Sequence, residues 1–121
     1  MNYIYYNINP KNEIKQDCVC RAISLAMDMN YYDVEYLLNR NASNQSCDTL
    51  VKSCYRQLLE GEFGLKSHKG HRRSVKEVAC RYPNNRLIMR VQGHLTASLY
   101  GECLDTFDCT GEIVDEYWVI Y

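Results

Sequence analysis

The sequence has little of what marks secreted, membrane-spanning or nucleic-acid-binding proteins. No apolar run reaches the length of a membrane span, and the first residues lack the charged-then-apolar order of a signal peptide. The formal net charge is −1, which gives no electrostatic reason to expect binding to nucleic acid or to a membrane surface. These features predict a protein that is made for the cytoplasm.

Proline is scarce, at 2 residues, and no repeat, linker or low-complexity segment interrupts the chain. At 121 residues the chain is close to the commonest domain size and is long enough to bury a core. We therefore expect a single domain that spans residues 1–121.

The cysteines lack the spacings of metal sites and of a closed set of disulfides. There are 7 of them, an odd number, so they cannot all pair with one another. No Cys-x-x-Cys occurs, and the close pair His68 and His71 has no cysteine pair at zinc-finger spacing. We expect no bound metal and no cofactor, and we expect most of the thiols to be reduced and buried.

Hydrophobic periodicity divides the chain into a helical first part and a stranded second part. Residues 1–8 favour a short edge strand, and three helices are expected between Asp17 and Gly61. The expected N-terminal residues of these helices are Asp17, then Asn30, then Ser46 or Asp48. A short helix should follow Ser74, with Glu77 completing a capping box.

Beyond Pro83 the period changes to two, which predicts strands over residues 86–91, 94–100, 103–108 and 117–121. Helices followed by an antiparallel sheet indicate an α+β domain of two packed parts. A functional site is then expected in the cleft between the parts.

The first predicted helix carries a cysteine at its start. Cys18 follows Asp17, and the helix behind it is apolar almost all round, so it should be a central helix. Unpaired N–H groups and the helix dipole at that position stabilise a thiolate and make it a nucleophile. The alternative is that Cys18 is a small apolar side chain in the core. Cys20, two residues later, should be buried on another face of the helix.

A predicted hairpin supplies a histidine and an acid. A three-residue loop over residues 100–102 would place His94 directly opposite Asp108 on neighbouring strands. Directly opposed side chains are close enough for a carboxylate to orient an imidazole. In that register Asp105 falls on the other face, opposite Ala97. Trp118 either shields this pair from water or is a plain core tryptophan.

Together these residues have the composition of a catalytic triad. A thiol needs a base that accepts its proton, and the base needs a third group that holds its tautomer. Cys18, His94 and Asp108 fit these roles in chain order. A cross-strand polar pair without catalytic function is the alternative for His94 and Asp108.

The order and layout of these residues resemble a minimal papain-like cysteine peptidase fold, with the nucleophile opening the central helix and the histidine and acid on the sheet. More closely, the chain is similar to small uncharacterised proteins of phages and prophages. The matching blocks are Asn9-Pro10-Lys11, Asp17-Cys18-Val19-x-Arg21-Ala22-Ile23, Gly93-His94-Leu95-Thr96-Ala97, Asp105-Thr106-Phe107-Asp108 and Tyr117-Trp118. The resemblance implies the fold and the triad but no substrate.

Two departures from the papain-like pattern concern the start of the helix. Gln16 stands where a glycine is expected, and Asn12 stands six residues before Cys18, where papain-like peptidases carry the glutamine of the oxyanion hole. Asn12 and Gln16 are therefore the two candidate side-chain donors, beside the backbone N–H of Cys18.

Two functions compete on this basis. One is a cysteine-dependent hydrolase that cuts a peptide, isopeptide or amide bond in a protein or peptide substrate. The other is a catalytically inert papain-like scaffold that binds a host protein, as a phage-encoded anti-defence factor would. The basic loop His68–Arg73 is a weak indication of nucleic-acid binding, because the total charge is negative.

Overall fold

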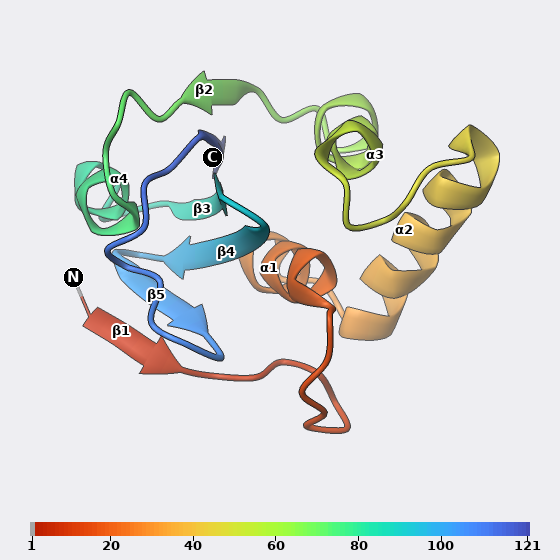
Figure 1. The fold of residues 1–121 in the computed structure, drawn as a ribbon, viewed down its shortest axis with the longest axis horizontal. Coiled ribbons are helices and arrows are strands. Elements are labelled where there is room, and N and C mark those ends of the chain that lie inside the picture. The colour runs from red at the N-terminus through yellow and green to blue at the C-terminus, as the bar shows by residue number, and fades with distance from the viewer. Residues whose placement is uncertain (1) are drawn as a thin grey trace.

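Helices occupy most of the first half of the chain and strands most of the second, in an α+β fold (Figure 1). The structure is a computed structural model, and it describes residues 2–121. The helices are α1 (Cys18–Met27), α2 (Tyr31–Gln45), α3 (Lys52–Arg56), the π-helical turn η1 (Gln57–Glu62) and α4 (Val75–Arg81). The strands are β1 (Asn2–Tyr5), β2 (Ser67–Lys69), β3 (Arg86–Val91), β4 (His94–Leu99), β5 (Glu102–Asp105) and β6 (Glu116–Ile120).

All six strands form one sheet, in the order β1-β5-β4-β3-β6-β2. The sequence predicted an antiparallel sheet. The sheet is mixed instead, because the edge strand β1 runs parallel to β5. The other neighbours are antiparallel. The second edge strand, β2, lies inside the segment that the sequence predicts to be a basic loop.

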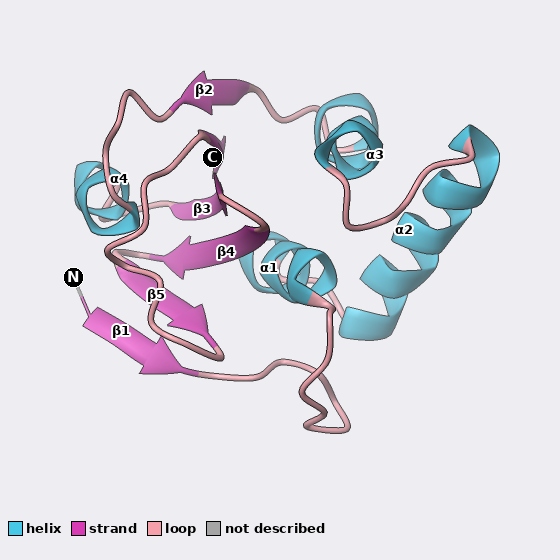
Figure 2. Cartoon of the chain, in the orientation of Figure 1, coloured by secondary structure: helices cyan, strands magenta, loops and turns pink. Residues whose placement is uncertain are grey.

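Two hydrophobic cores cover the two faces of the sheet. Figure 2 shows α4 on one side of the strands and α1, α2 and α3 on the other. The larger one joins α1, α2, α3 and η1 to Ile88, Leu95, Ala97 and Trp118 of the strands. The smaller one packs α4 against the other face, with Leu87, Met89 and Val119 among its members. Helix α1 is buried over most of its length, so the prediction of a central helix is confirmed.

Local capping signals were informative for two of the helices. Asn30 caps α2 by accepting a hydrogen bond from the Tyr32 N–H, and Ser74 forms the predicted capping box with Glu77. Asp17 precedes α1 as predicted, but its carboxylate makes no capping hydrogen bond and binds other side chains. The third helix begins at Lys52 and not at Ser46 or Asp48.

The predicted register of the β4–β5 hairpin is wrong. The turn has two residues, Tyr100 and Gly101, so Leu99 pairs with Glu102. Both turn residues have positive φ, 53° and 85°, which is the backbone of the primed turns that fit the twist of a hairpin. Tyrosine is not a usual residue for this conformation, and the sequence therefore favoured a longer loop.

Candidate active site

The thiol of Cys18 lies at the first residue of α1, where the first N–H groups of the helix have no partner within the helix. Cys18 is half-buried and lines a cleft of about 460 Å³. His94, the first residue of β4, lines the same cleft. Each side chain shifts the pKa of the other, so the structure brings these two predicted residues together.

The acid beside His94 is Asp105 and not Asp108. The Nε2 atom of His94 lies 2.7 Å from Oδ2 of Asp105. The two-residue turn moves Asp105 next to Thr96 and thus onto the face that His94 occupies. Asp108 lies beyond the end of β5, is exposed, and accepts hydrogen bonds from the N–H and hydroxyl of Thr110. The predicted pairing of His94 with Asp108, and the placement of Asp105 opposite Ala97, are therefore wrong.

Asp105 is 2% exposed, and its carboxylate accepts hydrogen bonds from several groups besides His94. Oδ2 also accepts from the Thr96 hydroxyl at 2.6 Å, and Oδ1 accepts from the Thr106 N–H at 2.7 Å and from Arg21 at 2.9 Å. Burial would raise the pKa of this carboxyl, but the hydrogen bonds from His94 and Thr96 and the charge of His94 lower it to about 2. Asp105 is consequently ionised, and His94 Nε2–H donates to it.

Arg21 connects this acid to the N-terminus of α1. Its guanidinium donates to Asp105 and, at 2.7 Å, to Oδ1 of Asp17. The other oxygen of Asp17 accepts from the Tyr31 hydroxyl at 2.7 Å and from the Asn9 amide at 3.0 Å. Arg21 is 7% exposed, so this ion-pair network is buried. The sequence predicted only a helix that is apolar almost all round, and not this network.

The surroundings of Cys18 favour its thiolate. Burial raises the pKa of the thiol, but the hydrogen bond with His94, a hydrogen bond with the Leu95 backbone and the charges of His94 and Arg21 outweigh burial. The pKa of Cys18 is lowered as a result. For His94, burial lowers the pKa, whereas hydrogen bonds with Asp105, Cys109 and Cys18 raise it to about 11. Each of the two groups therefore stabilises the charged form of the other.

Because Nε2 of His94 binds Asp105, the nitrogen left for proton exchange in the cleft is Nδ1. The Phe107 ring covers the imidazole, with ring centroids 4.7 Å apart, while remaining 47% exposed to the cleft. Phe107 is a site residue that sequence reasoning missed. Its signal was its place two residues after Asp105, which the wrong register concealed.

Of the two candidate oxyanion donors, Gln16 lines the cleft beside Cys18. Asn12 has a positive φ of 54°, is exposed, and is not among the cleft-lining residues of the described chain. Asn12 instead closes a turn in which its N–H donates to the Asn9 carbonyl oxygen at 2.8 Å. The geometry therefore favours Gln16 over Asn12.

Trp118 belongs to the core and not to the cleft. It is fully buried, its ring packs edge-on against Tyr55 with centroids 6.2 Å apart, and its indole N–H donates to Glu60 at 3.1 Å. The plain core interpretation of Trp118 is thus confirmed. The aromatic cover over His94 is Phe107.

Of the cysteines in the described chain, only Cys18 is among the residues that line the cleft. Cys20 is buried, as predicted, and burial raises the pKa of its thiol to about 12. Cys47 and Cys54 form a disulfide, whereas Cys80 is a free and exposed thiol. Cys103 and Cys109 are free and buried beside Asp105. Most of the thiols are reduced, as predicted, but the Cys47–Cys54 disulfide was not foreseen.

One group of side chains has the composition of a metal site. Ligand atoms of His94, Asp105 and Cys109 lie within 4.8 Å of one another. The Asp105 oxygens already accept from Arg21, Thr96 and His94, and the guanidinium at 2.9 Å would repel a second cation. The donors are therefore occupied by the hydrogen-bond network that holds His94, and this arrangement suits proton transfer better than metal binding.

Comparison with family models, curated proteins and solved structures gave no match for the chain. The resemblance to papain-like peptidases and to phage proteins therefore stays a prediction. Of the helices in residues 2–121, none combines the length and the apolar character that crossing a membrane requires.

Proposed function

We propose that this protein is a cysteine-dependent hydrolase of the papain-like type, which cleaves a peptide, isopeptide or amide bond with Cys18, His94 and Asp105. The observation that supports this most strongly is the chain of contacts from the Cys18 thiol to His94 and on to the buried carboxylate of Asp105. Its first two members open into one cleft, as a nucleophile and its base must.

The chemistry follows from the positions of the groups. The Cys18 thiolate attacks the substrate carbonyl carbon, and the backbone N–H of Cys18 and the Gln16 side chain stabilise the oxyanion. His94 Nδ1–H donates its proton to the leaving amine, which departs as the acyl thioester forms. His94, now neutral, takes a proton from water, and the resulting hydroxide attacks the thioester. The carboxylic acid product is released, and the Cys18 thiolate and the His94 imidazolium are regenerated. The proton balance therefore closes.

A small active ester tests this proposal without knowledge of the substrate. p-Nitrophenyl acetate should acetylate Cys18 and release nitrophenolate in a burst, followed by steady turnover as water cleaves the thioester. Mass spectrometry of the quenched reaction should find the acetyl group on Cys18. Cys80→Ala, at an exposed thiol outside the cleft, is the matched control and should react normally.

Cys18→Ala should abolish both the burst and the turnover. If this variant releases nitrophenolate as fast as the unaltered chain, the hydrolase proposal fails. A catalytically inert papain-like scaffold that binds a host protein then becomes the better account.

A further inference from the structure

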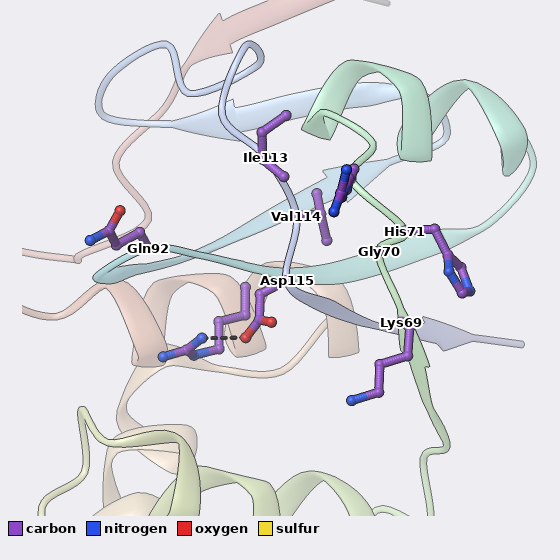
Figure 3. Close-up of a pocket in the computed structure, with 9 residues that line it drawn as sticks. Lys69, Gly70, His71, Gln92, Ile113, Val114 and Asp115 are labelled. Atoms are coloured by element: carbon purple, nitrogen blue, oxygen red, sulfur yellow. Dashed lines mark hydrogen bonds and ion pairs between the residues drawn. The ribbon is translucent and has the colours of Figure 1, made fainter.

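A second pocket, of about 640 Å³, adjoins the catalytic cleft. It is formed by the end of β2, the loop before α4, the β3–β4 turn and the segment before β6. Figure 3 shows Asp115 between Gln92 on one side and Lys69 and His71 on the other. Gly70 forms part of its wall, where a Cβ atom would lie only 1.8 Å from the Val114 carbonyl oxygen, so this close approach requires glycine.

The pocket and the cleft are continuous in the chain and in space. Arg90 lines both of them. Gln92, in the β3–β4 turn, lines the pocket, and the next two residues, Gly93 and His94, line the cleft. The two cavities therefore lie side by side at Arg90 and the β3–β4 turn.

The pocket is basic although the whole chain is not. It is lined by Lys69, Arg72 and Arg90 against a single acid, Asp115, whereas the formal net charge of the protein is −1. Arg90 is paired with Asp115. Across residues 2–121, no ion pair engages Lys69 or Arg72, and both side chains are exposed. Two cationic groups are thus available beside the cleft.

We infer that the substrate is a peptide segment with carboxylate side chains next to the bond that is cut, and that these carboxylates bind Lys69 and Arg72. This inference rests on the proposed hydrolase function, because that function places a polypeptide across Cys18. The charges would select acidic partners and hold them in register with the nucleophile. Nucleic acid is the less favoured polyanion because a thiolate nucleophile acts on acyl groups.

Binding to an inactive chain tests this inference. In a Cys18→Ala background, a fluorescent peptide of alternating glutamate and alanine should bind about tenfold more tightly than its glutamine counterpart, and the difference should shrink with added salt. Lys69→Glu with Arg72→Glu should remove that preference. The matched control is Lys76→Glu with Arg81→Glu on α4, which makes the same charge change at exposed positions outside both pockets and should preserve the preference.

Equal binding of the two peptides, or an unchanged preference in the Lys69 and Arg72 variant, would overturn the inference. Displacement of the acidic peptide by a short single-stranded oligonucleotide that binds more tightly would also overturn it and would assign the pocket to nucleic acid. Acetylation of Cys18 by p-nitrophenyl acetate is scored separately in the unaltered chain. Failure of the acidic-substrate inference is thus distinct from failure of the hydrolase proposal.

Discussion

Asp105 is a single buried anion between two cations. Its two oxygens accept hydrogen bonds from His94 on one side and Arg21 on the other, and Thr96 completes the set. A carboxylate that is held this firmly stays ionised and fixes the orientation of the imidazole. Asp105 therefore has the positioning role that the sequence assigned to Asp108.

Substitution of the two aspartates separates these assignments. Asp105→Asn should slow ester turnover by about 100-fold or more, because an amide cannot stabilise the imidazolium or hold the required tautomer. Asp108→Asn should change turnover less than about threefold, because Asp108 is exposed and bonded to Thr110. Steady-state release of nitrophenolate measures both. An equal loss in the two variants would contradict the geometry.

The ionisation of the pair sets the pH range of catalysis. Since the pKa of Cys18 is lowered, the acylation rate should rise with pH and reach its plateau at a pH below the ordinary thiol pKa of about 8.5. With an amide substrate, whose leaving amine needs a proton, the rate should fall only when the His94 imidazolium is lost, near its raised pKa of about 11. A rate profile with its alkaline limb near 6.5 would instead show an unperturbed histidine.

At the scale of elements, Arg21 attaches helix α1 to strand β5. The contact joins residues 84 positions apart, between a helix that presents the nucleophile and a strand that presents the acid. The apolar packing of α1 against β4 brings the elements together, and the ion pair fixes how they meet. The geometry of the candidate site therefore depends on a buried charge network as well as on the core.

Removing Arg21 should destabilise the protein strongly. Arg21→Ala leaves the buried carboxylates of Asp17 and Asp105 without their cation, at a cost of about 3–5 kcal/mol in the free energy of unfolding. Arg40→Ala, which removes the exposed ion pair with Glu62, is the control and should cost less than about 1 kcal/mol. Urea unfolding gives both values, and similar small losses would mean that the Arg21 network is not structurally important.

The β4–β5 hairpin explains which part of the site the sequence predicted. Alternation of apolar residues located both strands, and it placed His94 at the start of one of them. The register depended on the conformation of Tyr100, which has φ of 53°. No local pattern indicates a tyrosine there, and a one-residue slip exchanges the faces on which Asp105 and its neighbours lie.

At the scale of the whole molecule, the ionisable groups of the site link stability to pH. The pKa of Asp105 falls from 3.8 to about 2 on folding, so its contribution is present above pH 3.8 and is lost as the pH falls toward 2. The pKa of His94 rises from 6.5 to about 11, so its contribution is full below pH 6.5 and is lost as the pH rises toward 11.

Unfolding experiments at different pH values test the direction of both pH effects on stability. The difference in free energy of unfolding between the protein and Asp105→Asn should shrink as the pH falls from 3.8 to about 2. The difference between the protein and His94→Gln should shrink as the pH rises from 6.5 to about 11. Differences that stay constant with pH would show that neither group is perturbed by folding.

What the sequence predicted correctly was local, and what it missed was distant in the chain. The caps at Asn30 and Ser74, the position of Cys18 at the start of α1 and the α+β order all follow from patterns within a few residues. The parallel pairing of β1 with β5 and the bond from Arg21 to Asp105 join segments about a hundred residues apart. Periodicity carries no information about such pairs, since only tertiary packing decides them.

The central claim is that His94 activates Cys18, and alkylation of the thiols measures it most directly. Brief treatment with iodoacetamide at about pH 6, followed by mass spectrometry, should label Cys18 at least about tenfold faster than the exposed thiol of Cys80. His94→Ala should remove most of this advantage, whereas the control His71→Ala should leave it unchanged. If Cys18 reacts no faster than Cys80, or if His94→Ala has no effect, Cys18 is not an activated nucleophile.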